Sequence, residues 1–212
     1  MATGIFITIE GGEGAGKSTS LAYLESALTN AGCALVLTRE PGGTAMGERV
    51  RDILLHSKDL HIEAETELLL MFAARMQHIN EIIRPALSNG KVVICDRFTD
   101  ASYAYQGGGR GLDASRIAEL EQWVQADLRP NLTLLFDIPV EQGLARAGAR
   151  SEPDRFEREH NEFFDRVRAA YLKRAQAEPD RIAVIDASLD IEDVQQQLDP
   201  VIDRIITLSH GQ

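Results

Sequence analysis

Short apolar runs alternate with longer amphipathic segments along the chain. The apolar runs have the length of buried strands and occupy residues 5–9, 33–37, 92–95, 132–136 and 182–185. Between them, apolar residues recur at helical spacing, most clearly at 20–31, 63–88, 157–177 and 190–206, and another helix is expected to end near Leu55. Strands that alternate with helices are typical of βαβ units. The pattern therefore predicts an α/β fold, with a five-stranded parallel sheet covered by helices on both faces.

The segment 63–88 is the longest helical pattern and carries a broad apolar stripe. Most of this stripe is expected to pack in the core, and its width leaves apolar surface for a helix-to-helix dimer contact. Arg75 lies four residues after Met71 and three after Phe72, so a planar cation shares a helical face with an aromatic ring. Such a pair suits a flat heterocycle, which stacks on the ring and binds the guanidinium. An arginine that snorkels beside packed hydrophobic residues fits the same spacing.

Composition narrows the functional classes. The 212 residues are 44% hydrophobic, which predicts a single domain over residues 1–212. The 33 acidic and 22 basic side chains give a net charge of −11, so a basic nucleic-acid-binding surface is not expected. Cys33 and Cys95 lie among apolar residues, which predicts reduced, packed thiols. No apolar run approaches the roughly 20 residues that cross a bilayer, so we expect a cytoplasmic protein without a membrane partner.

A glycine-rich loop follows the first predicted strand. From Gly11 to Ser18 the sequence reads G-x-x-x-x-G-K-S, the phosphate-loop pattern, with a strand before it and a helix after it. Glycines let successive backbone N–H groups curl around a polyphosphate. Lys17 supplies a cation for the β- and γ-phosphates, and Ser18 supplies a hydroxyl ligand for Mg²⁺. The predicted nucleotide-binding residues are Gly11, Gly12, Glu13, Gly14, Ala15, Gly16, Lys17, Ser18 and Thr19.

Charged residues follow the second and third predicted strands, at the sheet edge where ligands bind in parallel sheets. Arg39-Glu40-Pro41-Gly42 forms a loop after the second strand. The helix beyond it carries Arg51, which the periodicity places equally well toward the site or on a solvated face. Asp96 ends the third strand and is placed to act on Mg²⁺ and its water shell. Arg97 offers a fork of donors to a second, acceptor phosphate.

Two further segments carry binding chemistry. Ser102, Tyr105 and Gln106 are spaced along one face of a helical turn and suit a small polar ligand, and the glycine run 107–109 is expected to form a mobile end. Residues 146–157 are small, contain glycine and bear arginines, which is typical of a mobile lid. A lid arginine stabilises charge on a moving phosphoryl group. Solvated helix charges are the alternative for these arginines.

Two other residues are interpreted as structural. Asp137 follows a predicted strand and precedes a proline and a helix, so a role in capping that helix is at least as well supported as a role as a second metal ligand. Trp123 lies in a predicted helix and is expected to serve packing.

Together these motifs resemble bacterial thymidylate kinases over essentially the full length. The matching stretches are Glu10 to Thr19, Thr38 to Gly43, Phe72 to Arg75, Asp96 to Phe98, Ser102 to Gly107 and Asp154 to Glu157. The phosphate loop is shared with many kinases, whereas the Arg-Glu-Pro-Gly loop combined with Asp-Arg and the Tyr-Gln turn is much more specific. The resemblance implies a P-loop nucleoside-monophosphate-kinase-like fold, a homodimer, and transfer of the γ-phosphoryl group of Mg²⁺-bound ATP to dTMP. The products would be dTDP and ADP, on the route to dTTP for DNA synthesis.

The resemblance implies how dTMP is held. Arg75 would read the thymine carbonyl and Gln106 the base edge. Arg97, assisted by Arg51, would hold the acceptor phosphate. Tyr105 would guard the sugar against a 2′-hydroxyl.

The resemblance also places Glu40 and Ser102 along the nucleotide pocket. It leaves the stacking residue open, because the family's phenylalanine often lies four residues before the reading arginine. That position here is Met71, and the phenylalanine is Phe72, so either side chain would cover the thymine ring.

The catalytic arginine of this family lies either inside the phosphate loop or on the lid. Here the loop position holds Glu13, which implies a lid arginine, with Arg150 as the first choice and Arg155 as the second. Arg146 is expected to be helical and structural. Glu13 and Asp96 would organise Mg²⁺ and its waters. The catalytic residues so implied are Lys17, Arg97, Arg150, Arg155 and Glu13.

Three alternatives share the phosphate loop. A GTP-dependent switch is disfavoured because the Asn-Lys-x-Asp element of guanine-reading proteins follows none of the predicted strands. A nucleotide-binding regulatory protein without turnover, and a kinase for another nucleoside monophosphate, stay open. Assays with different acceptors separate them.

Overall fold

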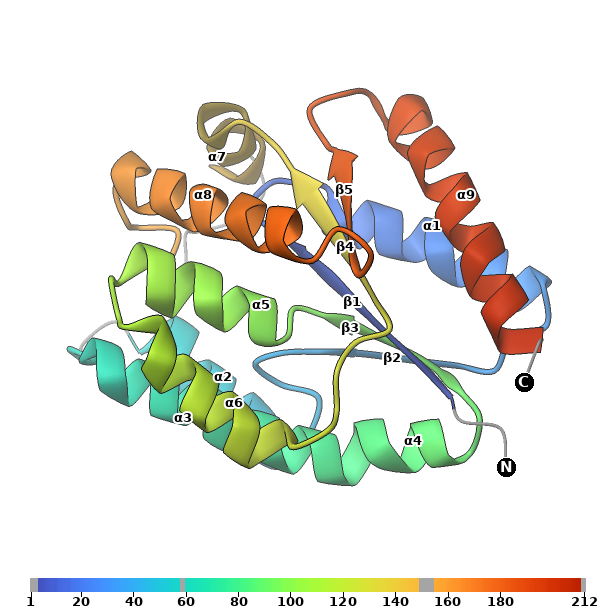
Figure 1. The fold of residues 1–212 in the computed structure, drawn as a ribbon. Helices are drawn as coiled ribbons and strands as arrows, with labels where there is room; N and C mark the ends of the chain where they lie inside the picture. The colour runs from blue at the N-terminus through green and yellow to red at the C-terminus, as the bar shows by residue number, and fades with distance from the viewer. Residues whose placement is uncertain (1–3, 58–59, 149–154, 211–212) are drawn as a thin grey trace.

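The chain forms one five-stranded parallel sheet, as the sequence predicts. The structure is a computed structural model that describes residues 4–57, 60–148 and 155–210. The strand order is β2-β3-β1-β4-β5, so β1 lies at the centre (Figure 1). The strands are β1 (Ile5–Gly11), β2 (Leu35–Arg39), β3 (Val92–Asp96), β4 (Leu132–Asp137) and β5 (Ile182–Asp186).

The strand register brings the phosphate loop next to the acidic end of β3. Ile9 of β1 pairs with Asp96, and Gly11 pairs with Phe136 of β4. Strand β2 begins at Leu35, two residues later than the apolar run suggests. The carboxyl ends of β1, β2 and β3 therefore meet at one edge of the sheet, where the sequence places its binding residues.

Helical segments connect the strands. The α-helices among the described residues are α1 (Lys17–Asn30), α2 (Ala45–His56), α3 (Ala64–His78), α4 (Arg84–Ser88), α5 (Thr99–Ser102), α6 (Ala114–Gln125), α7 (Val140–Gly148), α8 (Asn161–Ala177) and α9 (Ile191–His210). Two π-helical segments, η1 (Ile79–Ile83) and η2 (Tyr103–Gly109), extend α3 and α5. The predicted helix at 63–88 is thus α3, η1 and α4 in succession, and π-helical turns often occur at functional sites.

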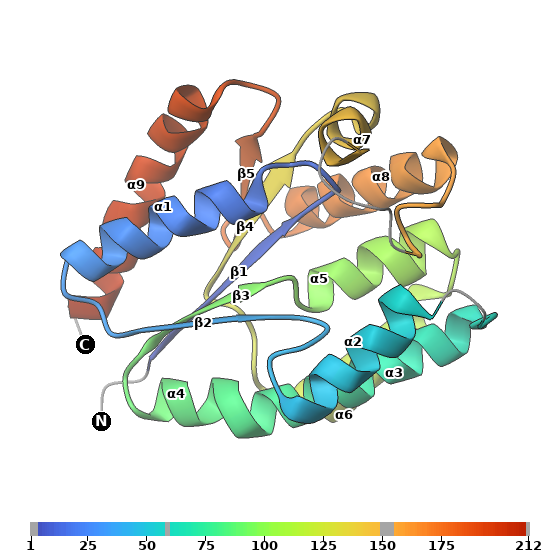
Figure 2. The same cartoon turned by 180° about the vertical axis from the view of Figure 1, so that it is seen from behind.

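Helices cover both faces of the sheet. Ile5, Ile7 and Ile9 of β1 face α1 and α9, which lie together on the side seen in Figure 2. Phe6 points to the opposite face, where α3, α4 and α6 complete a second core cluster. This alternation follows from the two-residue period of a strand. Because β1 is buried on both faces, its sequence is almost continuously apolar.

The glycine run 107–109 is not a mobile end, and that prediction is wrong. These residues lie inside η2, which packs closely on α8. A Cβ atom at Gly108 would lie 2.7 Å from Cβ of Ala170, and one at Gly109 would lie 2.4 Å from the ring of Phe163. The glycines therefore serve a close approach of two helices rather than flexibility.

Trp123 is also misplaced by the sequence interpretation. Its side chain on α6 is 75% exposed, so it does not pack in the core of this chain. Periodicity does not distinguish burial within one chain from burial between two chains.

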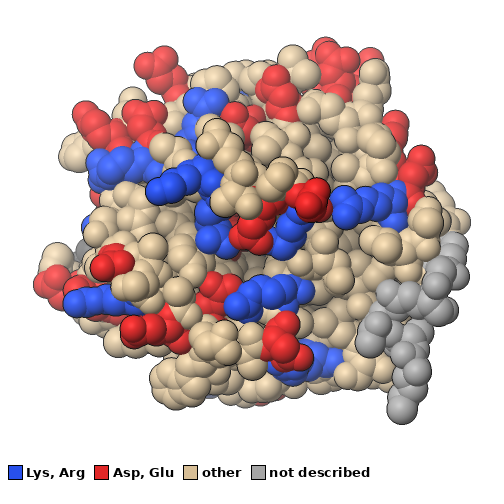
Figure 3. Space-filling model, viewed as in Figure 1, with Lys and Arg blue, Asp and Glu red and all other residues tan. Residues whose placement is uncertain are grey.

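The charge distribution on the surface and the hydropathy of the helices are relevant to possible nucleic-acid and membrane partners. Acidic and basic side chains are interspersed over the face shown in Figure 3. Among the described residues, none of the helices combines the length and the hydropathy that crossing a membrane requires.

Candidate active site

A cavity of about 230 Å³ opens at the carboxyl edge of the sheet and collects most of the predicted site residues. Its walls come from the phosphate loop, the β2–α2 loop, α3, the end of β3 and η2. The lining residues are Glu13, Gly14, Ala15, Gly16, Lys17, Ser18, Glu40, Pro41, Arg51, Leu55, Met71, Arg75, Asp96, Arg97, Phe98, Ala101, Ser102, Tyr105, Gln106 and Phe156. Sequence reasoning missed the apolar members Leu55, Phe98, Ala101 and Phe156, which carry no chemical signal of their own. The predicted residues Gly11, Gly12, Thr19 and Phe72 lie outside this lining.

The phosphate loop has the curled backbone that its glycines predict. Gly14 and Gly16 have φ angles of 67° and 76°, which L side chains rarely adopt. A Cβ atom at Gly14 would lie 1.9 Å from the carbonyl oxygen of Gly143, so helix α7 also requires glycine there. Helix α1 begins at Lys17, and its positive N-terminal end faces the loop.

Lys17 folds back onto the loop that precedes it. Its Nζ donates to the carbonyl oxygens of Gly11 at 3.0 Å and Gly12 at 2.6 Å. Burial, with a further contribution from the charge of Arg97, lowers the pKa of Lys17 to about 8. The lysine is thus already desolvated beside the place where a polyphosphate would lie.

Arg97 occupies a strained position in the cavity wall. Its φ angle is 66°, which is uncommon for a residue other than glycine and often marks a functional position. Nη2 donates to Oε1 of Glu13 at 2.6 Å, and Nη1 donates to the carbonyl oxygen of Gly11 at 3.0 Å. The guanidinium also lies 4.8 Å from the ring centroid of Tyr105. These contacts hold a planar cation next to the phosphate loop.

Glu13 of the phosphate loop is hydrogen-bonded to Arg97 and to Tyr105. Its Oε1 also accepts a hydrogen bond from the Tyr105 hydroxyl at 2.8 Å. Burial by itself would raise the pKa of Glu13, but the charges of Arg97 and Lys17 outweigh it and lower that pKa. Glu13 is therefore an anion that orients Arg97 and Tyr105, while its predicted action on Mg²⁺ stays a prediction.

Asp96 and Ser18 have the chemistry of a Mg²⁺ site. Both line the cavity, and the buried Oδ1 of Asp96 has no hydrogen-bond partner among the described residues. Mg²⁺ commonly binds one or two carboxylates and takes its other ligands from water and substrate phosphates. A carboxylate oxygen without a partner and a phosphate-loop hydroxyl that line the same cavity fit this requirement. Clusters of three or more potential metal ligands do not occur in the described part of the chain.

Arg75 is held almost completely by protein contacts at the other end of the cavity. Its Nε donates to Oε2 of Glu40 at 2.7 Å, and Nη2 donates to the carbonyl oxygen of Phe98 at 3.0 Å and to Oγ of Ser102 at 3.1 Å. The remaining nitrogen, Nη1, is buried and has no hydrogen-bond partner among the described residues. A fixed guanidinium with one unused N–H group is suited to a carbonyl acceptor on a ligand.

Phe72 supports this arginine instead of lining the cavity. The guanidinium of Arg75 lies 4.5 Å from the ring centroid of Phe72 and 5.0 Å from that of Phe98. Met71, one residue earlier on α3, is on the cavity wall. Consecutive helical residues point about 100° apart, so only one of this pair faces the site. The predicted stack of Phe72 on a heterocycle is therefore not what the geometry offers.

Gln106 and Arg155 meet at one buried carboxylate. Nε2 of Gln106 donates to Oε1 of Glu67 at 2.8 Å, and Arg155 forms an ion pair with the same side chain. Arg155 also donates from Nε to the carbonyl oxygen of Leu54 at 2.7 Å. Glu67 is completely buried, and sequence reasoning missed it because it lies within the apolar stripe of α3. The amide nitrogen of Gln106 is used here, which leaves its oxygen for a ligand.

The other predicted arginines are distributed as follows. Arg51 lines the cavity and donates from Nη1 to the carbonyl oxygen of Pro41 at 3.0 Å. Arg146 is helical, as predicted, and donates to the carbonyl oxygens of Ala187 at 2.7 Å and Ser188 at 3.1 Å. Arg150 lies outside the described residues.

Asp137 is not a helix cap, and that prediction is wrong. Its two carboxylate oxygens accept from Nε and Nη2 of Arg168 at 2.7 and 2.9 Å. This bidentate pair ties the end of β4 to helix α8.

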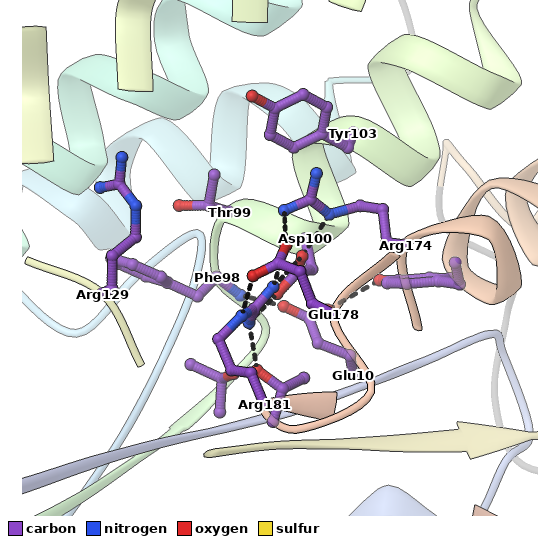
Figure 4. Close-up of polar contacts among 12 residues, drawn as sticks. Glu10, Phe98, Thr99, Asp100, Tyr103, Arg129, Arg174, Glu178 and Arg181 are labelled. Atoms are coloured by element: carbon purple, nitrogen blue, oxygen red, sulfur yellow. Dashed lines mark hydrogen bonds and ion pairs between the residues drawn. The ribbon is translucent and has the colours of Figure 1, made fainter. Parts of the chain in front are cut away.

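A buried polar cluster lies behind Arg97. Figure 4 shows Arg174 and Arg181 converging on Asp100, with Glu10 beside them. Glu10 accepts from the backbone N–H of Phe98 at 2.8 Å and, through its other oxygen, from the Tyr171 hydroxyl at 2.8 Å. Because Phe98 follows Arg97 directly, these bonds help to fix the strained turn. Only the fold brings these residues together, because they come from four separate parts of the sequence.

Burial of Glu10 makes stability depend on pH. Burial first, and then the charge of Asp100, raise the pKa of Glu10 from 4.5 to about 7, while Tyr171 and Arg97 partly oppose the shift. A folded-state pKa above the unfolded value stabilises the protonated form, so this contribution is present below about pH 4.5 and is lost as pH rises through about 7. We expect Glu10→Gln, which does not titrate, to gain about 2 kcal/mol relative to the natural chain between pH 5 and pH 8.

Urea unfolding of both proteins at the two pH values measures this difference. Glu25→Gln on the exposed side of α1 is the matched control and should show no such change. An equal gap between Glu10→Gln and the natural chain at pH 5 and pH 8 would contradict the assignment.

The fold and the cavity together indicate the class of protein to which the chain belongs. A parallel sheet with a phosphate loop after its central strand, and a second set of fixed arginines facing that loop, is the arrangement of a P-loop kinase with a nucleotide acceptor. The family model described as thymidylate kinase matches residues 9–198. The chain therefore belongs to the thymidylate kinase family.

Relatives match over the whole chain. The thymidylate kinase of Pseudomonas syringae pv. tomato (strain DC3000) is 59% identical over 209 residues, which cover 99% of this chain and 100% of the relative. That of Pseudomonas fluorescens (strain Pf0-1) is 60% identical over 209 residues, with the same coverage. The crystal structure of thymidylate kinase from Ehrlichia chaffeensis has a TM-score of 0.75 at 36% identity, covering 95% of this chain and 99% of that one.

Proposed function

We propose that this chain transfers the γ-phosphoryl group of Mg²⁺-bound ATP to dTMP, giving dTDP and ADP on the route to dTTP. The observation that carries the proposal is one cavity that joins Lys17 and Ser18 to Nη1 of Arg75, which has no hydrogen-bond partner among the residues that the structure describes. The first two residues suit a triphosphate, and the last suits the carbonyl of a pyrimidine such as thymine. The family of the chain and its full-length relatives support the same reaction.

The donor side would neutralise phosphate charge. Backbone N–H groups of the phosphate loop and the N-terminus of α1 surround the phosphates, and Lys17 turns from its loop carbonyls to the β- and γ-phosphates. Ser18 and Asp96 would hold Mg²⁺ together with its waters, and the bound ion would supply further positive charge to the phosphate oxygens.

The acceptor side would position a nucleophile that is already competent. Arg97 and Arg51, which both line the cavity, would bind the phosphate of dTMP. That phosphate is already ionised at neutral pH, so it does not have to lose a proton before it attacks. Phosphoryl transfer then depends on alignment and charge stabilisation, so neither a covalent intermediate nor a general base is required.

The base and the sugar would be read by donors and surfaces already in place. Nη1 of Arg75 donates to a thymine carbonyl, and the oxygen of Gln106 accepts from the base edge. Met71 covers the ring, because it is on the cavity wall and Phe72 is not. Tyr105, fixed to Glu13, borders the sugar.

A coupled assay of ADP formation with ATP and dTMP tests the proposal. Absence of ADP above background would contradict it and favour a regulatory nucleotide-binding protein. Comparison of dTMP with dUMP, dCMP and AMP distinguishes thymidylate from other acceptors. A strong preference for AMP would count against Arg75 and Gln106 as readers of thymine.

We further infer that residues 1–212 act as a single kinase domain with a lid at about 146–157. The five strands of the described residues belong to one sheet, and Arg146 and Arg155, near the two ends of that segment, are bound to the body of the domain. Closure of the lid would exclude water from the reacting phosphates.

The cellular setting is a separate proposal. We infer that the enzyme acts in the cytoplasm, since Cys33 and Cys95 are free thiols and thiols persist in reducing compartments.

A homodimer through α3 and α6 is also proposed. Leu69 on α3 is 56% exposed and Trp123 on α6 is 75% exposed, so each of these two helices presents a large apolar side chain to solvent. The two helices lie side by side, since Arg116 of α6 pairs with Glu65 of α3 at 3.4 Å. A second copy of this apolar face is the occupant that fits the family resemblance.

Trp123→Glu is expected to convert the dimer to a monomer, because a charge at the centre of an apolar interface is left without a partner. Multi-angle light scattering at micromolar concentration measures the mass. Trp123 is the only tryptophan of the chain, so its fluorescence should also shift to the red on dilution of the natural protein. Leu208→Glu on α9, an exposed leucine on the other side of the sheet, is the control and should stay dimeric. A monomeric natural protein would refute the interface.

A further inference from the structure

His78 is a buried histidine near the base end of the cavity that sequence reasoning did not identify. It ends helix α3 and is completely buried. Its Nδ1 lies 2.8 Å from Oε1 of Glu40, and its Nε2 lies 2.6 Å from Oγ1 of Thr38. Both ring nitrogens therefore have a partner from β2 or from the loop that follows it.

The contacts of Glu40 extend this set of hydrogen bonds to Arg75. Oε1 of Glu40 faces His78, and Oε2 accepts from Nε of Arg75. Glu40 and Arg75 are both buried, so neither side chain has solvent to replace a lost partner. These hydrogen bonds run from Thr38 through His78 and Glu40 to Arg75, a cavity-lining residue whose buried Nη1 has no hydrogen-bond partner among the described residues.

The chemistry fixes the ring's proton. A carboxylate oxygen only accepts, so Nδ1 of His78 carries the hydrogen and donates to Glu40. In the neutral ring, Nε2 then accepts from the Thr38 hydroxyl. The loop between β2 and α2 packs closely on this ring, since a Cβ atom at Gly43 would lie 2.7 Å from Nε2 of His78. The ring is therefore oriented by packing as well as by hydrogen bonds.

A buried histidine that merely fills the core is the competing explanation. It accounts for the burial of His78 but not for its place in a set of hydrogen bonds that leads to the cavity. If the donor to Oε1 were lost, Glu40 would keep a buried, unsatisfied oxygen. Its carboxylate would then rotate, and the guanidinium that it holds would turn with it.

We propose that His78 is a positioning residue for nucleobase selectivity, acting through Glu40 to aim Nη1 of Arg75 at the base. The inference rests on the proposed function of the cavity. Nη1 can only donate, so a correctly aimed Arg75 favours a pyrimidine with a carbonyl at position 4, as in thymine, over one with an amino group there, as in cytosine.

Two amide variants separate the roles of the ring nitrogens. His78→Asn places an N–H group where Nδ1 lies and keeps the bond to Glu40, whereas His78→Gln places its amide near Nε2 and loses that bond. We expect His78→Gln to raise KM for dTMP about tenfold with kcat within twofold, and to reduce the dTMP-to-dCMP ratio of kcat/KM by about tenfold. His78→Asn should keep both values within about threefold of the natural enzyme. His61→Gln, an exposed histidine, is the control.

Thr38 gives an independent test if the histidine variants fold poorly. Thr38→Val should raise KM for dTMP about threefold, Thr38→Ser should not, and the effect of valine should vanish in the His78→Gln background. Equal dTMP-to-dCMP ratios for the Asn, Gln and natural proteins would overturn the role of His78 while leaving the kinase function intact. Failure of the natural protein to phosphorylate dTMP would overturn both proposals.

Discussion

Replacement of Arg97 by methionine is expected to lower kcat/KM for dTMP by roughly 10³-fold. Arg97 contacts both halves of the cavity, because it donates to Glu13 of the phosphate loop and its guanidinium lies 4.8 Å from the ring centroid of Tyr105 on η2. Methionine keeps most of the volume and the packing on Tyr105 but removes the donors and the charge. Arg97→Lys should lose about 10²-fold, since a point charge replaces a bidentate fork.

The pairing of Arg97 with Glu13 sharpens this test. Without the arginine, Glu13 loses its ion-pair partner and is a less compensated anion beside bound phosphates, so part of the loss in Arg97→Met comes from repulsion. The double variant Arg97→Met with Glu13→Gln should therefore be more active than Arg97→Met alone. Strictly additive effects of the two changes would show that the pair is not coupled.

A second arginine provides the control for this experiment. Arg168 is also bound to a carboxylate, that of Asp137, but it lies outside the cavity lining. Arg168→Met should change kcat/KM by less than about threefold. A loss in Arg97→Met no larger than that in Arg168→Met would remove Arg97 from the catalytic residues.

The sequence predicts best the features that backbone chemistry dictates. The phosphate loop needs glycines with positive φ after a buried strand, and Gly14 and Gly16 have that conformation. The five predicted strands are confirmed, and each corresponds to a largely apolar run of strand length. Their carboxyl ends then necessarily share an edge, which is why Glu40, Asp96 and Lys17 meet.

Sequence periodicity does not predict the contacts of a side chain when these depend on packing against another segment of the chain. It places Phe72 and Arg75 on one helical face, but it does not show that this face packs on Phe98 and leaves Met71 at the cavity. Periodicity also does not show that the glycines of η2 allow α8 to approach closely. A run of glycines in a sequence is compatible both with a flexible segment and with close helix packing.

Buried polar residues are a second kind of failure. Glu67 and His78 lie within the largely apolar pattern of α3, and their partners are 39 and 40 residues away along the chain. A hydrogen bond over such a separation leaves no local signal. These residues become visible only when the fold shows that each of them holds a side chain of the cavity.

The lid arginines are expected to differ sharply in function. Arg150→Ala should lower kcat by about 10³-fold while changing the Kd of dTMP by less than about threefold, because a lid arginine acts on charge that develops during transfer. Arg155→Ala should leave kcat within about tenfold, since the Arg155 side chain is already bound to Leu54 and to Glu67. Coupled turnover assays and calorimetric titration of dTMP without ATP measure the two quantities.

Glu67 explains why Arg155 is the weaker candidate. To reach a phosphate, Arg155 would have to leave a completely buried carboxylate, whose other cationic partner, Arg110, lies at 3.3 Å. Departure of Arg155 would therefore cost free energy at the moment of catalysis. Arg146→Ala, at the opposite end of the same segment, is the matched control, because its guanidinium is bound to backbone carbonyls. Unchanged turnover in Arg150→Ala, together with a large loss in Arg155→Ala, would transfer the catalytic role to Arg155 and require this buried ion pair to open during lid closure.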